Sequence, residues 1–300
     1  MIPAALARQL AATVAARKLG LRDFVRRAMG HAWVPAPHLE PLYDALERCE
    51  REPVRAVVSM PPGHAKSESV LHALAWLGAR TPGDLHGYVS YTAPATRVKS
   101  LRCRDIAEAA GVVPSPDVWS WAEWRNVCGG GLLASGIGGR MTGERITGTL
   151  VVDDPFKGPR EAGSSTYRDM VSAWFDAVAY TRLIPGRSSC VVVHTRWERD
   201  DLIGRLLKVI GADGAAPWQE IRLPALDDAG RPLWPEVYPR AALDAIRAQL
   251  DARAISAATS PPSPSASAHH RVISADVVAR CGGVACRNPW YSSAMGPTYP

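Results

Sequence analysis

The sequence lacks any long hydrophobic run that would cross a membrane. No uncharged apolar stretch reaches about 18 residues, the length that a membrane-spanning helix requires. The N-terminus also lacks a signal peptide, because Arg8, Arg17 and Lys18 interrupt its apolar stretch and no small-residue cleavage site follows. We therefore expect no membrane segment and a cytoplasmic location.

Cysteine is scarce and shows no metal-binding pattern. The chain has 6 cysteines in 300 residues. Cys281 and Cys286 form the one close pair, and no second pair or histidine spacing completes a zinc site with them. We expect free thiols in a reducing compartment rather than disulfides or a structural zinc ion.

Acidic residues are almost missing from the end of the chain, where Asp276 is the only acid after Asp251. A two-metal nuclease needs several carboxylates, so this segment is not expected to form one. Ala254–Ala268 consists of Ala, Ser, Thr and Pro apart from Ile255, and it buries too little apolar surface to offset its ordering entropy. The prediction for 255–300 is a low-complexity, disordered tail.

Positive charge is present in modest excess and is concentrated at the N-terminus. The net charge of +6 and the pI near 9.1 permit a polyanionic partner without requiring one. Residues 1–30 carry one acid, Asp23, against the basic residues Arg8, Arg17, Lys18, Arg22, Arg26 and Arg27. Helical patterns over 4–29 and 39–50 then predict a basic helical region over 1–50.

The middle of the chain alternates short apolar runs with longer helical stretches. The clearest predicted strands are Val54–Met60, Gly87–Tyr91, Thr149–Val152 and Cys190–His194. Their nearly continuous apolar character is typical of strands covered on both faces. Residues 51–254 are therefore predicted to form an α/β domain with a doubly wound, mainly parallel sheet.

The first predicted strand leads into PPGHAKSES (61–69) and then an apolar helix. Strand, short loop, Lys-Ser and helix is the context of a phosphate-binding loop, whose backbone N–H groups surround the phosphates. The residues expected to bind nucleotide are Pro62, Gly63, His64, Ala65, Lys66 and Ser67, with the Ser67 hydroxyl also on Mg²⁺. The general pattern has glycine where Met60 and Ala65 stand, so a Pro-Gly turn before an exposed helix start is the alternative.

Two adjacent carboxylates end another predicted strand. Asp153 and Asp154 follow Thr149–Val152, and Pro155 terminates the run. Neighbouring side chains at a strand end point to opposite sides, so one can hold a metal while the other faces water. We expect Asp153 to bind Mg²⁺ and Asp154 to act as the catalytic carboxylate. A surface Asp-Asp turn is the alternative interpretation.

The strand Cys190–His194 ends in Thr195 and Arg196, at the edge where open α/β sheets bind ligands. Thr195 is predicted to sense a γ-phosphate, and Arg196 to contact it or the catalytic carboxylate. For Arg196, a salt bridge to nearby acids is an equal alternative. Arg140, Arg182 and Arg196 are the candidates for an arginine that neutralises charge during phosphoryl transfer.

Several of these segments together resemble a known family. PPGHAKSE, the stretch TGERITGTLVVDDPFKGPREA (142–162) and the stretch YTRLIPGRSSCVVVHTRWERDDLIGRLL (180–207) are similar to the large terminase subunits of tailed bacteriophages. RLPAL (222–226) and PLWPEVYP (232–239) add to the likeness, which covers about residues 30–254 in the family's order.

The resemblance implies a RecA-like P-loop ATPase that uses ATP and Mg²⁺ to move double-stranded DNA into a procapsid. It places the Walker B acid on Asp153, the catalytic carboxylate on Asp154 and the coupling motif near Thr195. Many members carry glutamate where Asp154 stands, so the attacking water would sit closer here. The implied partners are a portal protein and a small terminase subunit in a bacterial host's cytoplasm, with a ring oligomer when docked.

The family continues into a nuclease domain, whereas the likeness here fades at about Ala254. We expect a truncated or prophage-remnant motor without nuclease activity, with a deliberately split motor as the rival explanation. Alternatives for the whole chain are another P-loop DNA translocase or helicase, and a catalytically inactive remnant.

Three further features are weaker. The helix after Tyr91 carries Arg97, Lys99, Arg102 and Arg104, which either contact DNA phosphates or form an ordinary charged face. The tryptophans Trp119, Trp121 and Trp124 are expected to pack in the core or in a lid rather than stack on bases. His38 is a candidate neighbour of the adenine.

Overall fold

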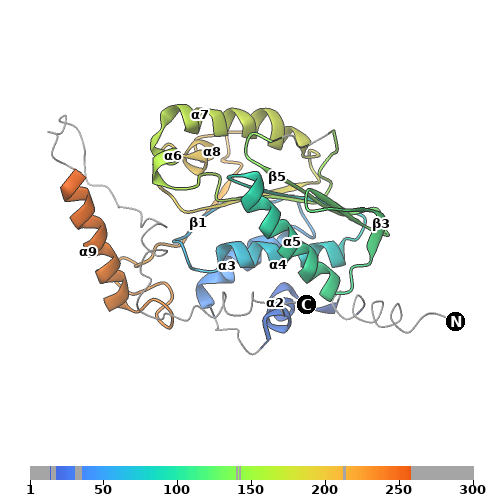
Figure 1. The fold of residues 1–300 in the computed structure, drawn as a ribbon, viewed down its shortest axis with the longest axis horizontal. Coiled ribbons are helices and arrows are strands. Elements are labelled where there is room, and N and C mark those ends of the chain that lie inside the picture. The colour runs from blue at the N-terminus through green and yellow to red at the C-terminus, as the bar shows by residue number, and fades with distance from the viewer. Residues whose placement is uncertain are drawn as a thin grey trace, which may run out of the picture.

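An eight-stranded sheet runs through the molecule with helices on both faces (Figure 1). The computed structural model describes residues 14, 18–30, 36–139, 141, 143–211 and 214–257. The strands are β1 (Arg55–Ser59), β2 (Leu85–Ser90), β3 (Pro114–Trp119), β4 (Glu123–Asn126), β5 (Gly131–Gly136), β6 (Thr149–Asp153), β7 (Ser189–His194) and β8 (Gln219–Arg222).

The strand order is β3-β4-β5-β2-β6-β7-β1-β8, and every pairing from β5 to β8 is parallel. Only β3–β4 and β4–β5 pair antiparallel among the described strands. The predicted α/β class with a mainly parallel sheet is therefore confirmed, and β1, β2, β6 and β7 lie where the sequence predicts strands.

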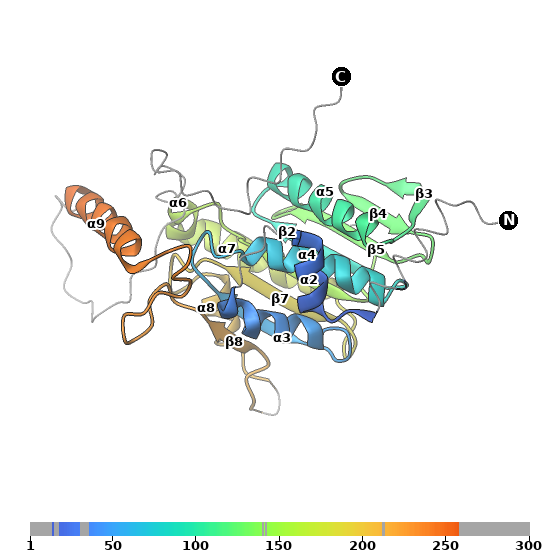
Figure 2. The same ribbon diagram turned by 90° about the horizontal axis from the view of Figure 1, so that it is seen from below.

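One face of the sheet is covered by four helices (Figure 2). These helices are α2 (Leu21–Met29), α3 (Glu40–Arg48), α4 (Lys66–Arg80) and α5 (Ala93–Ala109). The other face carries α6 (Pro159–Gly163), α7 (Ser165–Trp174) and α8 (Leu202–Leu206). The chain also forms short helical turns at η2 (Pro37–Leu39), η3 (Phe175–Ala179) and η4 (Tyr180–Arg182).

The two layers of helices explain why the central strands are largely apolar. Successive side chains of a strand point to opposite faces, so each central strand contributes to both halves of the core. Val58, Val151 and Val193 belong to the core cluster under α2–α5. Val57, Val152 and Val192 belong to the cluster under α6–α8. All six of these valines are fully buried.

The N-terminal basic residues are partly neutralised within the protein. Arg22 on α2 forms ion pairs with Glu40, Asp44 and Glu47 on α3. Arg26 pairs with Asp23 at 2.5 Å. The described part of the N-terminal region is helical as predicted, but these charges are less available to a polyanion than the sequence indicates.

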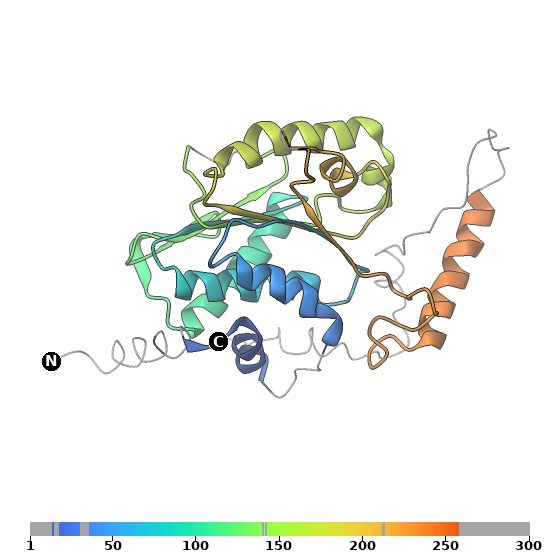
Figure 3. The ribbon, with the colours of Figure 1, turned by 180° about the vertical axis from the view of Figure 1, so that it is seen from behind.

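The last helix, α9 (Arg240–Ala257), stands apart from the sheet (Figure 3). The predicted boundary after residue 254 falls inside α9, and 258–300, the rest of the predicted tail, lies outside the described residues. Within the described part of the chain, no helix combines the length and apolar character needed to traverse a bilayer.

Candidate functional site

Three strands deliver the predicted site residues to one edge of the sheet. In the register, Ser59 of β1 pairs with His194 of β7, and Asp153 of β6 pairs with Val193 of β7. The strands are parallel, so their carboxyl ends meet at this edge. The loop 60–65, Asp154 and Thr195 each follow directly, and this edge is where open α/β sheets bind ligands.

The loop after β1 has a backbone that its sequence only partly indicates. The Met60 amide donates to the His194 carbonyl, which anchors the loop to β7. Gly63 and Ala65 then take positive φ angles of 76° and 63°. Ala65 adopts the left-handed conformation that usually calls for glycine, and it is the N-cap of α4, which begins at Lys66. The free amides and the dipole of this helix start favour an anion.

Lys66 joins the three elements at the centre of the site. Its buried Nζ donates to Thr195 Oγ1 at 3.0 Å and forms an ion pair with Asp154 Oδ2 at 3.2 Å. The Thr195 hydroxyl donates in turn to the Met60 carbonyl at 3.1 Å. The loop lysine, the second aspartate and the threonine, which lie far apart in the sequence, are therefore in direct contact.

Asp154 is held in an unusual backbone conformation. Its φ is 48°, and Asp154 and Ala65 are the only non-glycine residues with positive φ in the described segments. Its Oδ1 accepts a hydrogen bond from the Thr195 amide at 3.1 Å. Burial of the carboxyl group acts to raise its pKa, but the Lys66 ammonium, together with His194 and the Thr195 amide, outweighs burial and holds the pKa well below its usual range.

The pKa of Asp153 is shifted in the opposite direction from that of Asp154. Its side chain is buried, and its Oδ2 accepts a hydrogen bond from the Tyr88 hydroxyl at 2.7 Å. Its Oδ1 is buried without a hydrogen-bond partner among the described residues. Burial, and then the charge of Asp154, raise the pKa of Asp153. A buried carboxylate oxygen without a protein partner is suited to binding a cation.

Mg²⁺ suits this arrangement because it keeps several water and phosphate ligands and needs only one or two from the protein. Across the described segments, no group of three or more His, Cys, Asp or Glu residues could hold a metal ion alone. An ion here would use Asp153 and, from the first turn of α4, the half-buried hydroxyl-bearing Ser67.

The candidate arginines are placed differently from one another. Arg196 turns away from Lys66, and its Nε donates to Asp201 Oδ2 at 2.7 Å. Its Nη2 donates to the Arg199 carbonyl at 2.9 Å. Arg182 lies on η4 with a buried Nε that has no hydrogen-bond partner in the described part of the chain. Arg140 lies outside the described residues.

An aromatic cluster behind the loop is the part of the site that the sequence does not indicate. His64 stacks on Tyr238 with ring centroids 4.6 Å apart, and Trp234 lies against both His64 and His38. His38 Nε2 lies 3.2 Å from the His64 carbonyl, so this side chain braces the loop. The stretch 232–239 is separated from the loop by about 170 residues of chain, which is why no local pattern reveals the contact.

Tyr238 also explains the glycine at position 63. A Cβ on Gly63 would lie 2.0 Å from the Tyr238 hydroxyl oxygen, and φ there is already left-handed. Any side chain at this position would have to displace the Tyr238 ring. The loop 60–65 and the stretch 232–239 therefore pack against each other.

Of the weaker sequence features, His38 braces the loop and the charge of Lys99 acts on Asp153, whereas Arg102, Arg104 and the tryptophans make other contacts. On α5, Arg102 lies 3.6 Å from Glu68, and the Arg104 guanidinium lies over the Trp119 ring. Trp119 and Trp124 are register partners on β3 and β4 with centroids 5.5 Å apart, and Trp124 is buried. The expected core packing is confirmed for Trp124.

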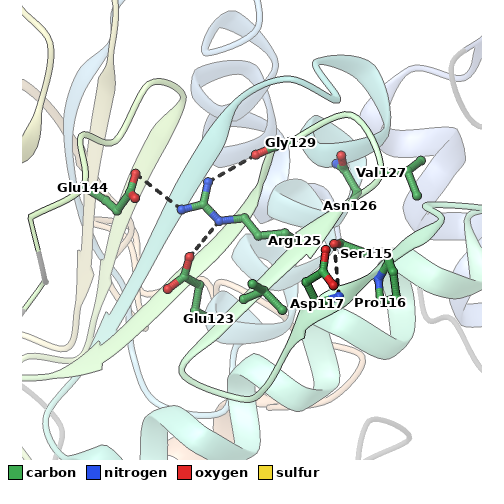
Figure 4. Close-up of a pocket in the computed structure, with 10 residues that line it drawn as sticks. Ser115, Pro116, Asp117, Glu123, Arg125, Asn126, Val127, Gly129 and Glu144 are labelled. Atoms are coloured by element: carbon green, nitrogen blue, oxygen red, sulfur yellow. Dashed lines mark hydrogen bonds and ion pairs between the residues drawn. The ribbon is translucent and has the colours of Figure 1, made fainter.

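An open, solvent-facing pocket lies at the other end of the sheet, against β3 and β4 (Figure 4). Arg125 is its one basic side chain, and Glu123 at 2.8 Å, Glu144 at 3.4 Å and the Gly129 carbonyl neutralise it. In the strand order, β5 and β2 separate this pocket from β6. It contains none of the predicted site residues.

Comparison with known proteins gives limited similarity. No protein-family model matches the sequence, and no curated protein matches it. Among solved structures, the crystal structure of the HK97 bacteriophage large terminase is similar with a TM-score of 0.49 and 12% sequence identity. The similarity covers 75% of this chain and 48% of that one, so this chain spans about half the length of that terminase.

Proposed function

We propose that this chain is a magnesium-dependent ATPase with a RecA-like P-loop site. The observation that carries the proposal is the contact of Lys66 with Asp154 and Thr195 at the carboxyl edge of the parallel sheet. A loop lysine, a strand-end carboxylate and a neighbouring hydroxyl are the parts that P-loop hydrolysis requires. The left-handed backbone at Ala65 and Asp154 supports it, because strained non-glycine residues gather at functional sites.

In this proposal, each polar group of the site has a distinct role. The amides of residues 62–67 surround the β- and γ-phosphates, and Lys66 contacts them. Mg²⁺, when bound, neutralises phosphate charge, and Asp153 and Ser67 hold it. Asp154 orients the attacking water and accepts its proton as the water oxygen bonds to the γ-phosphorus and the bond between that phosphorus and the leaving oxygen of ADP breaks. Thr195 reports the presence of the γ-phosphate through its contact with Lys66.

The same lysine links nucleotide binding to the strength of the base. Without nucleotide, the Lys66 ammonium is the main influence that keeps the pKa of Asp154 low, so Asp154 is a weak base. When Lys66 turns to the phosphates, that influence is reduced and the pKa of Asp154 rises. Asp154 therefore becomes an effective base only with nucleotide in place.

The work that hydrolysis drives is proposed from the sequence motifs. Their resemblance to phage large terminases favours translocation of double-stranded DNA into a procapsid, within the 51–254 domain. A portal protein, a small terminase subunit and a ring on the portal are the corresponding partners, in a bacterial host's cytoplasm. Another P-loop translocase or helicase remains the alternative motor, and packaging into capsids against strand separation on a forked duplex distinguishes the two.

One observation favours a second candidate, an inactive remnant. Lys66 and Asp154 already neutralise each other in a closed ion pair, which a nucleotide would have to break. If the pair never opens, the chain binds no nucleotide and turns none over.

ATP turnover with and without double-stranded DNA tests these proposals. We expect Lys66→Ala to lower kcat at least about 100-fold, because lysine contacts the transferring phosphate directly. Lys208→Ala is the control, since that lysine is exposed and pairs with Asp200 on the surface. Equal activity of the parent and Lys66→Ala would contradict the ATPase proposal, and no turnover by the parent favours the inactive remnant.

A further inference from the structure

His194, the last residue of β7, is a buried histidine placed between two carboxylates. Its Nδ1 lies 3.5 Å from Asp154 Oδ1, and its Nε2 lies 3.6 Å from Asp201 Oδ2. The side chains of His194 and Asp201 are fully buried. Because β7 pairs with both β1 and β6, the His194 ring projects from the strand that lies between the other two strands of the site.

Neither ring nitrogen of His194 has a hydrogen-bond partner among the described residues. Buried polar atoms are nearly always satisfied, and leaving one unpaired costs about 1–3 kcal/mol. Both nitrogens face a carboxylate oxygen at a distance slightly too long for a hydrogen bond. Contacts between catalytic groups are often long before the substrate binds and shorten in the complex. The unpaired atoms therefore indicate a contact that closes with ligand.

Asp201 is the fixed end of this row of side chains. Its Oδ1 accepts a hydrogen bond from the Gly204 amide at 2.9 Å and caps α8. Its Oδ2 accepts from Arg196 Nε at 2.7 Å. Leu202 and Ile203, which follow it, are buried in the core. The carboxylate therefore cannot move without disturbing α8 and its packing.

Phe156 limits the movement of the histidine from a third side. The Phe156 and His194 ring centroids lie 5.4 Å apart, and Phe156 is buried two residues after Asp154. The imidazole is thus confined by an aromatic ring and by two carboxylates. A small shift along the line from Asp201 to Asp154 is the motion that would shorten the long contacts.

We propose that His194 and Asp201 are positioning residues that hold the Asp154 carboxylate in its catalytic orientation once Lys66 has turned to the nucleotide. This inference rests on the proposed ATPase function. Before binding, Asp154 is held by Lys66 at Oδ2, and by the Thr195 amide with His194 beside it at Oδ1. After Lys66 leaves, only the contacts at Oδ1 remain. His194, supported by Asp201, keeps the freed carboxylate from rotating away from the attacking water.

The same geometry favours one of the two roles that the sequence leaves open for Arg196, the salt bridge to a nearby acid. Its guanidinium neutralises Asp201 and donates to the carbonyl of Arg199, so it supports the buried carboxylate from outside. We assign Arg196 to this supporting role rather than to the phosphate.

The test is Asp201→Asn, which keeps an oxygen to cap α8 and keeps the side-chain volume while removing the charge. We expect kcat to fall roughly 10–100-fold, as for groups that orient a primary ligand, with the KM for ATP unchanged. Asp200→Asn is the matched control, because Asp200 precedes Asp201 but pairs on the surface with Arg205 and Lys208. Its kcat should equal that of the parent.

A second variant, His194→Gln, covers the case in which Asp201→Asn folds poorly, which a thermal melt of each variant reveals. Residues that act as a unit are non-additive, so the double variant should be no slower than the slower single variant. Additive losses, an unchanged kcat or a raised KM would overturn the positioning role while leaving the ATPase proposal intact. A parent chain without turnover would overturn both.

Discussion

At the scale of single residues, the candidate site contains two non-glycine residues with a left-handed backbone, Ala65 and Asp154. Lys66 and Asp154 can be proposed from sequence because their types and spacing match what phosphate chemistry needs. The left-handed φ of Ala65 and Asp154 cannot, because alanine and aspartate both prefer other conformations. The contact between Lys66 and Thr195 depends on strand order, which no local pattern encodes.

The strain at Ala65 can be measured. Glycine adopts the φ of 63° without the steric penalty that alanine has in the left-handed region, but it also raises the entropy of the unfolded chain. The net effect of Ala65→Gly should be a stabilisation of roughly 0.5–1 kcal/mol. Urea unfolding measures this change. The control, Ala73→Gly in the interior of α4, should destabilise by at least about 1 kcal/mol. A loss of stability in both variants would show that position 65 is unstrained.

At the scale of elements, the strands that the sequence predicts are buried almost throughout, although β5 is equally buried and is not among them. β1, β6 and β7 are apolar and short, so their composition alone identifies them. The sequence does not single out β3 and β8 in the same way. β3 (PSPDVW) contains two prolines, and β8 (QEIR) has one buried residue, as suits strands at the two edges of the sheet.

The stretch 232–239 should depend on one aromatic ring. Tyr238→Ala removes the stack on His64 and should cost about 1–2 kcal/mol of stability, whereas Tyr238→Phe keeps the ring and should cost much less. Hydrogen exchange of the amides of 232–239 and of the loop 60–65 measures the coupling. Faster exchange in Tyr238→Ala is expected in both segments together. Acceleration confined to 232–239 would show that the loop holds its shape without the tyrosine.

At the scale of the whole molecule, the class of fold follows from alternating strand and helix patterns, because each strand must be covered on both sides. The location of the site follows too, since parallel strands bring their carboxyl ends together. The tail, the DNA and the protein partners stay predictions. They depend on surfaces and segments that the folded core does not determine.

The buried histidines should make the folded state sensitive to acid. Burial lowers the pKa of both His64 and His86 to about 4, whereas the unfolded chain binds these protons near pH 6.5. Between these values the unfolded state holds more protons. The stabilisation is therefore complete above pH 6.5 and is lost as the pH falls towards 4.

By this reasoning, moving from pH 7.5 to pH 5 should lower the free energy of unfolding by on the order of 2 kcal/mol per histidine. Urea titrations at several pH values measure the slope. His86→Gln should flatten it even if the variant is less stable at every pH. If the slope of His86→Gln equals that of the parent, His86 does not contribute to the pH dependence of the free energy of unfolding.

In the proposed ATPase, the pairing of Lys66 with Asp154 has a consequence for the end of each catalytic cycle. A Lys66 ammonium that has released its phosphate can pair with the Asp154 carboxylate, which lies 3.2 Å away. The buried Lys66 ammonium therefore has a carboxylate partner within the protein itself. In the proposed ATPase, spent nucleotide would compete with an internal anion for the same cation, so the chain itself would help to expel its product.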